Sequence, residues 1–298
     1  MVHTSVVVAR YRPKQSLWYF CQVDQKWELK NQIKKILFMG YIYILFLAAI
    51  LKSRNLKRGE SWSAHTLVVG NSQYIDLAKV ACYSFLANNR GISVTIHTDN
   101  SLVLEVSNSF TYAIRRGLVV VKAHKEWEGK SWQYCKLELL EFVGMNCDLY
   151  FDADTRWFTE FSPTPTPIFL VKEYLLVSRF PYRDFVKAKY PEMASSISML
   201  NTSVVCFGSE GRKTQALTRE IWNIYFEYLK FLDDLDLGEI DEINSSRLSE
   251  QLAVSIGTQL MFSEISPLKE SDLIRDRKIV DSCYFGATGS KYFRVQAT

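Results

Sequence analysis

Short apolar runs alternate with longer periodic stretches along the middle of the chain. The apolar runs at residues 66–70 and 92–97 predict buried strands. Between them, apolar residues recur at helical spacing over 74–88, which predicts a helix. Strand, helix and strand in this order form the βαβ unit of a parallel sheet. We therefore expect an α/β fold.

The same two patterns continue toward the carboxyl end. Further strands are predicted at residues 118–122, 149–151, 168–171, 174–178 and 201–207, and further helices at 132–143, 213–231 and from Ser249 onward. Prolines at every second position of the stretch 162–167 predict a stiff, extended linker. We interpret this linker as the boundary between two lobes of one domain.

Residues 36–51 carry no charge and lie between Lys35 and Lys52. As a helix, these residues span roughly 24 Å. An ordinary membrane span takes ~20 residues, so this segment is shorter than usual. Lysine side chains that reach toward the headgroups, and a thinner bilayer, would close this gap. A buried core helix is the alternative. We interpret the segment as a single membrane anchor, which makes the protein membrane-associated and single-pass, of Golgi or ER type II if the source is eukaryotic.

Basic residues are equally numerous on both sides of this segment, so its orientation stays undecided. The anchor divides the chain into a basic tail at 1–35, the anchor at 36–51, a stem at 52–64 and a globular domain at 65–298.

At 298 residues the chain is long enough to bury a full core. The net charge is +4 and much of the basic excess lies near the amino end, so we infer no nucleic-acid partner. The six cysteines form no CxxC pair, which speaks against a thiolate metal site.

The predicted strand at 149–151 runs directly into Asp152-Ala153-Asp154. On an extended backbone, residues i and i+2 point to the same side, so both carboxylates would project from one edge. Two adjacent carboxylates repel each other, and burying either one is costly. Mn²⁺ or Mg²⁺ resolves both problems, because hard cations prefer oxygen ligands. Such a cation also holds a diphosphate. The alternative is that the two acids only cap a turn.

The chain contains a control for this motif. Asp234-Leu235-Asp236 has the same spacing, but it lies in the acidic run 233–242 and no apolar strand precedes it. We interpret that run as a solvated loop or helix end. Context therefore distinguishes the pair at 152 and 154.

Ligands of parallel sheets bind beyond the carboxyl ends of the strands. This rule places Gly70, Asn71, Asp99 and the acid pair along one edge of the sheet. The chain has neither a GxGxxG nor a GxxxxGK[ST] motif, so a Rossmann dinucleotide site or a P-loop is not supported.

In this order, the elements resemble the GT-A-fold glycosyltransferases, and among these the glycogenin and bacterial galactosyltransferase group (family 8-like). The resemblance covers about residues 65–293 and rests on the opening strand and helix through Tyr74, the strand ending at Asp99, the helix with Lys136, LYFDADT at 149–155, LNTSVVCF at 200–207 and SEQLAVS at 249–255. It implies a Rossmann-like, mostly parallel central sheet flanked by helices. In this chain the predicted hydrophobic helix would precede that fold.

The resemblance further implies a nucleotide-diphosphate sugar donor and a carbohydrate, lipid or protein acceptor. Residues 65–160 would form the nucleotide-sugar half and 161–298 the acceptor half. By resemblance, Tyr74 and Asp99 would flank the nucleobase, Lys136 would lie near the donor, Asp152 would touch ribose and metal, and Asp154 would hold the metal. Each residue has a plainer alternative: a helix-start position for Tyr74, a turn for Asp99 and a solvated helix face for Lys136.

The chain departs from this group at the metal. Related families often carry a metal-binding histidine near the carboxyl end, but all four histidines of this chain precede the acid pair. The matching segment contains Asp281 instead, which would serve as a hard oxygen ligand. Alternatively, the metal keeps an extra water or is bound weakly.

The stereochemistry of transfer stays open. An inverting enzyme needs a carboxylate base on the acceptor side, and Glu250 is the candidate. A retaining enzyme would use Gln251 or Asn201 as polar neighbours of the donor. Glu250 also fits a plainer role as an acid stabilised by the dipole at a helix N-terminus.

Three other functions compete with glycosyl transfer. A nucleotidyltransferase would carry a Gly-rich, basic loop after the first strand, where Gly70-Asn71-Ser72 is poor in both. A haloacid-dehalogenase-type phosphatase would place its acid pair near the start of the domain. A catalytically inactive, membrane-tethered, transferase-like binding module is the non-enzymatic alternative.

Overall fold

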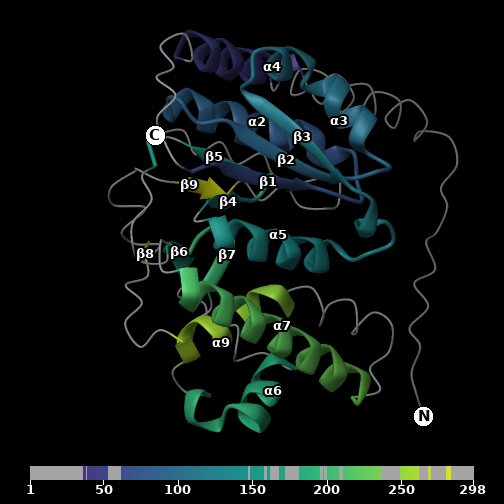
Figure 1. Cartoon of the computed structure of the whole chain (residues 1–298), viewed down its shortest axis with the longest axis vertical. Coiled ribbons are helices and arrows are strands. Elements are labelled where there is room, and N and C mark those ends of the chain that lie inside the picture. The colour runs from purple at the N-terminus through teal and green to yellow at the C-terminus, as the bar shows by residue number, and fades with distance from the viewer. Residues whose placement is uncertain are drawn as a thin grey trace, which may run out of the picture. The chain divides into compact units, whose positions relative to one another are not determined.

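The structure is a computed structural model, and it forms two compact units, residues 1–44 and 45–298. The second unit contains the sheet and the helices packed on it (Figure 1). The residues that the structure describes are 36–37, 39–52, 62–146, 148–157, 160–161, 168–171, 181–194, 197, 200–207, 211–235, 249–261, 268–269 and 280–282.

Helices and strands alternate through most of this range. The strands are β1 (Ala64–Val68), β2 (Val94–Asp99), β3 (Val119–His124), β4 (Leu149–Phe151), β5 (Thr155–Trp157), β6 (Ile168–Val171), β7 (Leu200–Cys206), β8 (Leu268–Lys269) and β9 (Val280–Ser282). The helices are α2 (Gln73–Asn88), α3 (Val103–Ser109), α4 (Thr111–Arg115), α5 (Trp132–Asn146), α6 (Tyr182–Lys189), α7 (Gly211–Asp233) and α9 (Ser249–Met261), with short 3₁₀ turns η1 (Lys125–Trp127) and η3 (Pro191–Met193).

The main sheet has the strand order β3-β2-β1-β4-β7-β6-β8. Strands β1 to β4 run parallel to one another, whereas β7 is antiparallel to both β4 and β6. Strands β6 and β8 are also parallel, so the sheet is mixed but mostly parallel, as predicted, and only the antiparallel β7 was not expected. Because β1, β2 and β4 are parallel neighbours, their carboxyl ends meet at one edge, as predicted from the sequence.

The side chains of β4 alternate between the two faces of the sheet. Leu149 and Phe151 are buried, and Phe151 stacks on Phe85 of α2 with ring centroids 5.3 Å apart. Tyr150 points to the opposite face and packs into the core cluster that includes Leu139 of α5. Figure 1 shows α2 and α5 on opposite sides of these strands. The side chain at 152 continues the face of Tyr150, toward α5.

The carboxyl end of α2 is fastened to the chain that follows the acid pair. The Ser84 hydroxyl accepts a hydrogen bond from the Trp157 amide at 3.0 Å, and the Asn88 amide group donates to the Trp157 carbonyl at 3.1 Å. The Asn89 side chain accepts from the Phe161 amide at 2.7 Å. These bonds satisfy backbone groups of β5 and of the following residues, which would otherwise be buried without partners.

Helices α7 and α9 pack closely at Gly257. A Cβ atom added to Gly257 would lie 2.9 Å from Cγ1 of Ile221 and 3.5 Å from its backbone nitrogen. Gly257 and Ile221 are surrounded by the apolar core formed mainly by α5, α7 and α9. The absence of a side chain at 257 therefore lets the two helix backbones approach each other.

Residues 36–37 and 39–52 are helical, in agreement with the predicted helix at 36–51. Phe46 packs against Tyr83 and Tyr112, with ring centroids 5.1 and 5.3 Å away. Within the described part of the chain, every helix is too short or too polar to cross a membrane. This finding gives no support to the membrane anchor predicted at 36–51.

Most of the other predicted elements are present with shifts of one to three residues. The strand at 149–151 and the strand at 168–171 have the predicted bounds. Strands β5, β8 and β9 and helices α3, α4 and α6 were not predicted. The predicted tail at 1–35, most of the stem at 52–64, the proline-rich stretch 162–167 and the strand at 174–178 lie outside the described residues.

We expect Gly257→Ala to destabilise the protein by about 1–3 kcal/mol, because overpacking forces neighbouring atoms to move. Helix propensity by itself would favour alanine by about 1 kcal/mol. Thermal and urea unfolding of the purified variant would measure the balance. A melting temperature equal to or above that of the wild type would contradict the close approach at this position.

Gly40→Ala is the matched control, since Gly40 lies in the helix at 39–52 and no atom lies within 4 Å of an added Cβ. Here the propensity effect acts without a clash. We expect a small gain in stability, in the direction opposite to that of Gly257→Ala.

Candidate functional site

The acid pair lies in a turn rather than on an extended strand. Asp152 follows β4 directly, and its amide donates to the Ser203 carbonyl of β7 at 2.8 Å. The Thr155 amide donates to the Asp152 carbonyl at 3.0 Å, which closes a turn through Ala153 and Asp154. The predicted i, i+2 geometry of an extended backbone is therefore wrong for Asp154. A hydrogen-bonded turn presents both carboxylates at the carboxyl end of β4, and both side chains are partly exposed.

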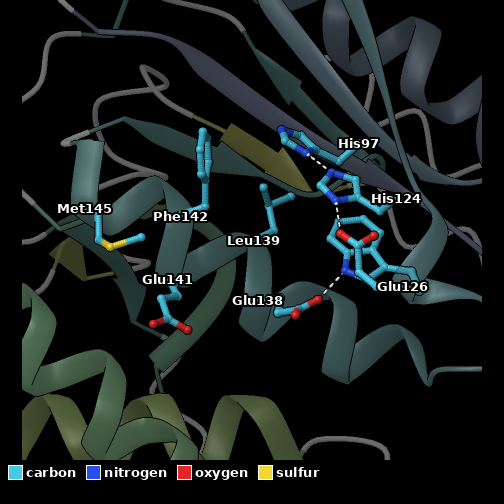
Figure 2. A pocket seen from close by; sticks show the side chains of 9 residues that line it. His97, His124, Glu126, Glu138, Leu139, Glu141, Phe142 and Met145 are labelled. Atoms are coloured by element: carbon cyan, nitrogen blue, oxygen red, sulfur yellow. Dashed lines mark hydrogen bonds and ion pairs between the residues drawn. The ribbon is translucent and has the colours of Figure 1, made fainter.

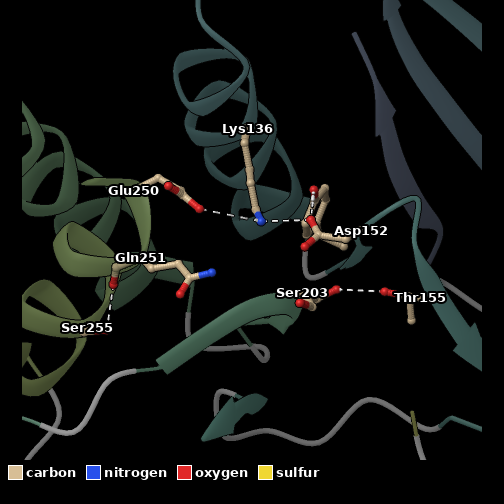
Figure 3. Close-up of polar contacts among 8 residues, drawn as sticks. Lys136, Asp152, Thr155, Ser203, Glu250, Gln251 and Ser255 are labelled. Atoms are coloured by element: carbon tan, nitrogen blue, oxygen red, sulfur yellow. Dashed lines mark hydrogen bonds and ion pairs between the residues drawn. The ribbon is translucent and has the colours of Figure 1, made fainter. Parts of the chain in front are cut away.

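Asp152 forms an ion pair with Lys136 of α5. The Lys136 ammonium lies 2.8 Å from Oδ1 of Asp152, and the hydroxyl of Tyr150 donates to the same oxygen (Figure 3). Tyr150 and Asp152 share a face of the strand because they are two residues apart. Lys136 reaches them from the helix that covers this face. The alternative of a solvated lysine is wrong, because the Lys136 side chain is 2% exposed.

A second carboxylate faces the same ammonium. Oε1 of Glu250, in the first turn of α9, lies 4.0 Å from Nζ of Lys136. Lys136 also lies 5.3 Å from the ring centroid of Tyr150 and 5.9 Å from that of Trp132. Burying an ammonium requires compensation by opposite charge and hydrogen bonds. Asp152, Glu250 and the two rings supply negative charge and π density around it.

Glu250 has an unusual environment for a carboxylate. Its side chain is 0% exposed, and no side chain among the described residues donates a hydrogen bond to its carboxylate oxygens. Burial raises the pKa of Glu250 from 4.5 to about 7; Lys136 opposes this rise and Asp152 adds to it. Glu250 is therefore divided between its neutral and ionised forms near neutral pH.

The Tyr150 phenol is held in its neutral form. Burial raises its pKa well above 10, and the charge of Asp152, the hydrogen bond to Asp152 and the charges of Asp154 and Glu250 act in the same direction. The neutral Tyr150 hydroxyl therefore donates a hydrogen bond to Asp152 at any physiological pH. The same effect indicates that Asp154 and Glu250 lie close enough to act on this ring electrostatically.

Asp99 braces the loop that follows β1. Its carboxylate accepts hydrogen bonds from the Gly70 amide at 3.0 Å, from the Leu102 amide at 3.1 Å and from the Ser101 hydroxyl. Burial raises the pKa of Asp99, but these hydrogen bonds outweigh it and the net shift is downward. Gly70 adopts φ 73°, a conformation that glycine takes without strain. Asp99 thus has the predicted turn role, at the carboxyl end of β2.

The remaining predicted residues lie around this edge. Tyr74 is in the first turn of α2 and is 41% exposed. Gln251 follows Glu250, and Figure 3 shows its amide directed toward the space between Lys136 and Ser203. Asn201 belongs to β7, beyond the point where this strand pairs with β4. Asp281 belongs to β9, where its backbone lies opposite that of Arg156 in the antiparallel strand β5. The side chains of Asn201 and Asp281 lie outside the description.

Asp152 and Asp154 fit a divalent cation in their donor chemistry. Mg²⁺ in phosphate-binding sites commonly takes one or two protein carboxylates, and substrate phosphates and water complete its shell. Within the described residues, no three His, Cys, Asp or Glu side chains converge to hold an ion by themselves. A cation at this turn would therefore depend on ligands from a bound substrate or from residues outside the description.

The sequence reasoning missed two groups of polar residues. Tyr150 was read only as part of a buried strand, although its position two residues before Asp152 implies a shared face. Three histidines at 65, 97 and 124 form a hydrogen-bonded chain that is described below. Their sequence signal was the occurrence of one histidine in or after each of three consecutive strands.

No protein-family model matches this chain, and no curated protein matches it. Solved structures that align with it include PaToxG glycosyltransferase, at 9% identity and TM-score 0.43 over 82% of this chain and 84% of that one. The apo form of mouse xyloside xylosyltransferase 1 aligns at 11% identity and TM-score 0.40, over 67% and 82%. Glycosyltransferase GlyE of Streptococcus pneumoniae TIGR4 aligns at 10% identity and TM-score 0.42, over 70% and 45%. Because these TM-scores lie below 0.5, they do not establish a shared fold, and function is argued from the topology and the site.

Proposed function

We propose that this protein is a glycosyltransferase of GT-A type that takes a sugar from a nucleotide-diphosphate donor to an acceptor hydroxyl. The observation that carries the proposal is the turn bearing Asp152 and Asp154 at the carboxyl end of β4, with the buried Lys136 ammonium on Asp152. Ligands of α/β sheets bind at this end of the strands. The resemblance of the ordered motifs to the family 8-like group supports the same function.

Departure of a nucleoside diphosphate leaves new negative charge on its phosphates. Mn²⁺ or Mg²⁺ held by Asp152 and Asp154 would supply Lewis-acid stabilisation of that charge. Asp152 is held in place for this by the Tyr150 hydroxyl and the Lys136 ammonium. Both contacts use Oδ1, so they orient the carboxylate group as a whole. Asp281 remains our candidate for a further oxygen ligand, because β9 pairs with the strand that follows Asp154.

Lys136 contributes a fixed positive charge beside the donor site. A buried ammonium reorganises little during a reaction, so its field acts fully on charge that develops nearby. In this proposal, Tyr74 and the loop held by Asp99 contact the nucleobase at the ends of β1 and β2. Residues 65–160 would then form the donor half, and residues 161–298 the acceptor half.

We propose a positioning role for Glu250 in preference to that of an acceptor-side base. Its side chain is fully buried and faces Lys136, whereas a base must come within hydrogen-bond reach of the acceptor hydroxyl. Through Lys136, the charge on Glu250 influences how firmly the ammonium is held against Asp152. Gln251 and Asn201 remain polar candidates for contact with the donor sugar.

Asp154→Asn tests the metal-dependent part of the proposal. We expect donor turnover with Mn²⁺, measured as sugar transfer or slow donor hydrolysis, to fall at least about 100-fold, since electrostatic stabilisation of this kind is worth several kcal/mol. The rise in melting temperature caused by Mn²⁺ with a nucleoside diphosphate should also disappear. Asp234→Asn, in the other Asp-x-Asp sequence, is the matched control and should retain both properties.

Full turnover by Asp154→Asn would refute the metal site. Ligand-dependent stabilisation of the wild type without any transfer or hydrolysis of nucleotide sugars would instead favour the transferase-like binding module. Release of pyrophosphate from a nucleoside triphosphate would favour a nucleotidyltransferase.

Glu250→Gln tests the environment of Glu250. The folded protein holds a proton on Glu250 up to about pH 7, while the unfolded chain releases it near 4.5. The folded state therefore binds more protons between these values, and wild-type stability falls as pH rises through this window. The neutral glutamine escapes this loss, which amounts to about 3 kcal/mol at most. We expect the stability of the variant relative to the wild type to be higher at pH 8 than at pH 4.5, as measured by urea unfolding.

The same variant separates the two roles of Glu250. Loss of a general base typically lowers turnover by about 100-fold or more, whereas loss of a positioning charge should mainly raise the KM for the donor. A large fall in kcat with an unchanged KM would contradict the positioning role.

A further inference from the structure

Three histidines and two carboxylates form a continuous hydrogen-bonded chain across the sheet. Oδ2 of Asp148 lies 2.9 Å from Nε2 of His65, and Nδ1 of His65 lies 2.9 Å from Nε2 of His97. Nδ1 of His97 lies 2.8 Å from Nε2 of His124, and Nδ1 of His124 lies 2.9 Å from Oε1 of Glu126. Every ring nitrogen in the chain therefore faces another member of it.

The chain runs from the interior to the surface. His65 and His97 are 4% and 1% exposed, whereas the Glu126 side chain is 62% exposed. The histidines come from the parallel neighbours β1, β2 and β3, and Phe142 of α5 packs against the first two rings. Trp127 stacks on His124 with ring centroids 3.9 Å apart. Figure 2 shows the outer part of the chain on the wall of a pocket of about 240 Å³.

The number of protons in this chain follows from its hydrogen bonds. Each of the four contacts needs one proton between its two heavy atoms. A neutral imidazole has one N–H donor and one acceptor nitrogen, so three neutral histidines supply three protons. Both ends of the chain are carboxylates, which only accept when ionised. The pKa of Glu126 is lowered, first by a hydrogen bond from its own backbone amide and then by the hydrogen bond with His124, and burial opposes this only weakly. Glu126 is therefore an ionised acceptor.

We infer that this chain binds one proton more than three neutral imidazoles at neutral pH, as an imidazolium held between Asp148 and Glu126. With that proton, all four contacts are hydrogen bonds. Without it, two lone pairs would face each other at less than 3 Å somewhere along the chain. The ligand of this site is the proton, and neither the sequence motifs nor the proposed glycosyl transfer accounts for it.

The positive charge resides mainly at an end of the chain. Burial lowers the pKa of His97 to about 2, and His65, His124 and Lys122 add to this effect. The charge is therefore most stable on His65 beside Asp148 or on His124 beside Glu126. The charge moves from His65 to His124 when the proton shared by His65 and His97 and the proton shared by His97 and His124 each move to the facing nitrogen. No hydrogen bond changes partner in this transfer.

Other charged groups also face the outer end. Lys122 of β3 acts on His97 and lies 4.8 Å from the Phe142 ring centroid. Glu138 and Glu141 of α5 line the same pocket as His124. Glu138 accepts a hydrogen bond from the indole of Trp127, and Glu141 accepts one from Trp222.

Loss of the proton should open the contact between His124 and Glu126. His65 and His97 are buried and cannot exchange their partners for water, whereas the Glu126 side chain is 62% exposed and can turn into solvent. Glu126 lies in the turn η1 with Trp127, on the wall of the pocket. The protonation state of the chain is thereby coupled to the rim of this pocket.

Glu126→Gln tests the proton count directly. A glutamine amide donates a hydrogen bond, so it pairs with the lone pair of Nδ1 of His124, and all four contacts close with three neutral imidazoles. In the full chain with ¹⁵N-labelled histidine, we expect NMR at pH 7.5 to show one imidazolium among residues 65, 97 and 124 of the wild type and none in the variant. The exposed position of Glu126 makes misfolding of this variant no obstacle.

A second measurement follows from linkage. Free histidines are neutral above about pH 6.5, so wild-type folding takes up one proton at pH 7.5–8.5. The unfolding equilibrium constant of the wild type should therefore rise about tenfold per pH unit relative to that of Glu126→Gln. Glu128→Gln, which removes an equal charge at an exposed position of the next loop, should behave like the wild type. Three neutral imidazoles in the wild type, or equal pH slopes for the wild type and Glu126→Gln, would overturn the inference.

Discussion

The ammonium group of Lys136 is the charge on which the arrangement of the site depends. It is buried between the carboxylates of Asp152 and Glu250, which belong to the end of β4 and the start of α9. Removing Asp152 would leave the buried ammonium with only the more distant Glu250, and loss of a buried charge partner commonly costs several kcal/mol. Helix α5, strand β4 and helix α9 are therefore held in one relative position by electrostatics as well as by apolar packing.

The two faces of the sheet carry different kinds of side chains. On the α2 face, Phe85, Phe151 and Trp157 form an aromatic cluster. On the α5 face lie the Tyr150 hydroxyl, the Asp152 pair with Lys136 and the histidine chain. The alternation of side chains along each strand produces this division. Both faces of the sheet thus bury apolar side chains, while the polar and titratable groups of the site gather on the α5 face.

Local periodicity was sufficient to predict much of the fold and part of the site. The strand before Asp152 was predicted with its observed bounds. The family resemblance, and not periodicity, singled out Lys136, which the structure shows paired with Asp152. The antiparallel entry of β7 was not predictable in this way, because strand direction depends on distant pairing. The turn at Asp154 was missed because the extended backbone was assumed to continue from β4 to Asp154, whereas the strand ends at Phe151. The histidine chain was missed because each member has its partner on another strand.

Strand β9 pairs with β5, the strand that immediately follows the acid pair, although the two are far apart in the sequence. During synthesis, domains fold from the amino end as the chain emerges. The turn bearing Asp152 and Asp154 therefore leaves the ribosome well before the strand that pairs with its continuation. A nascent chain can complete β1 to β4 while the region next to the acids still lacks this strand, and the region reaches its finished form only after β9 has been made.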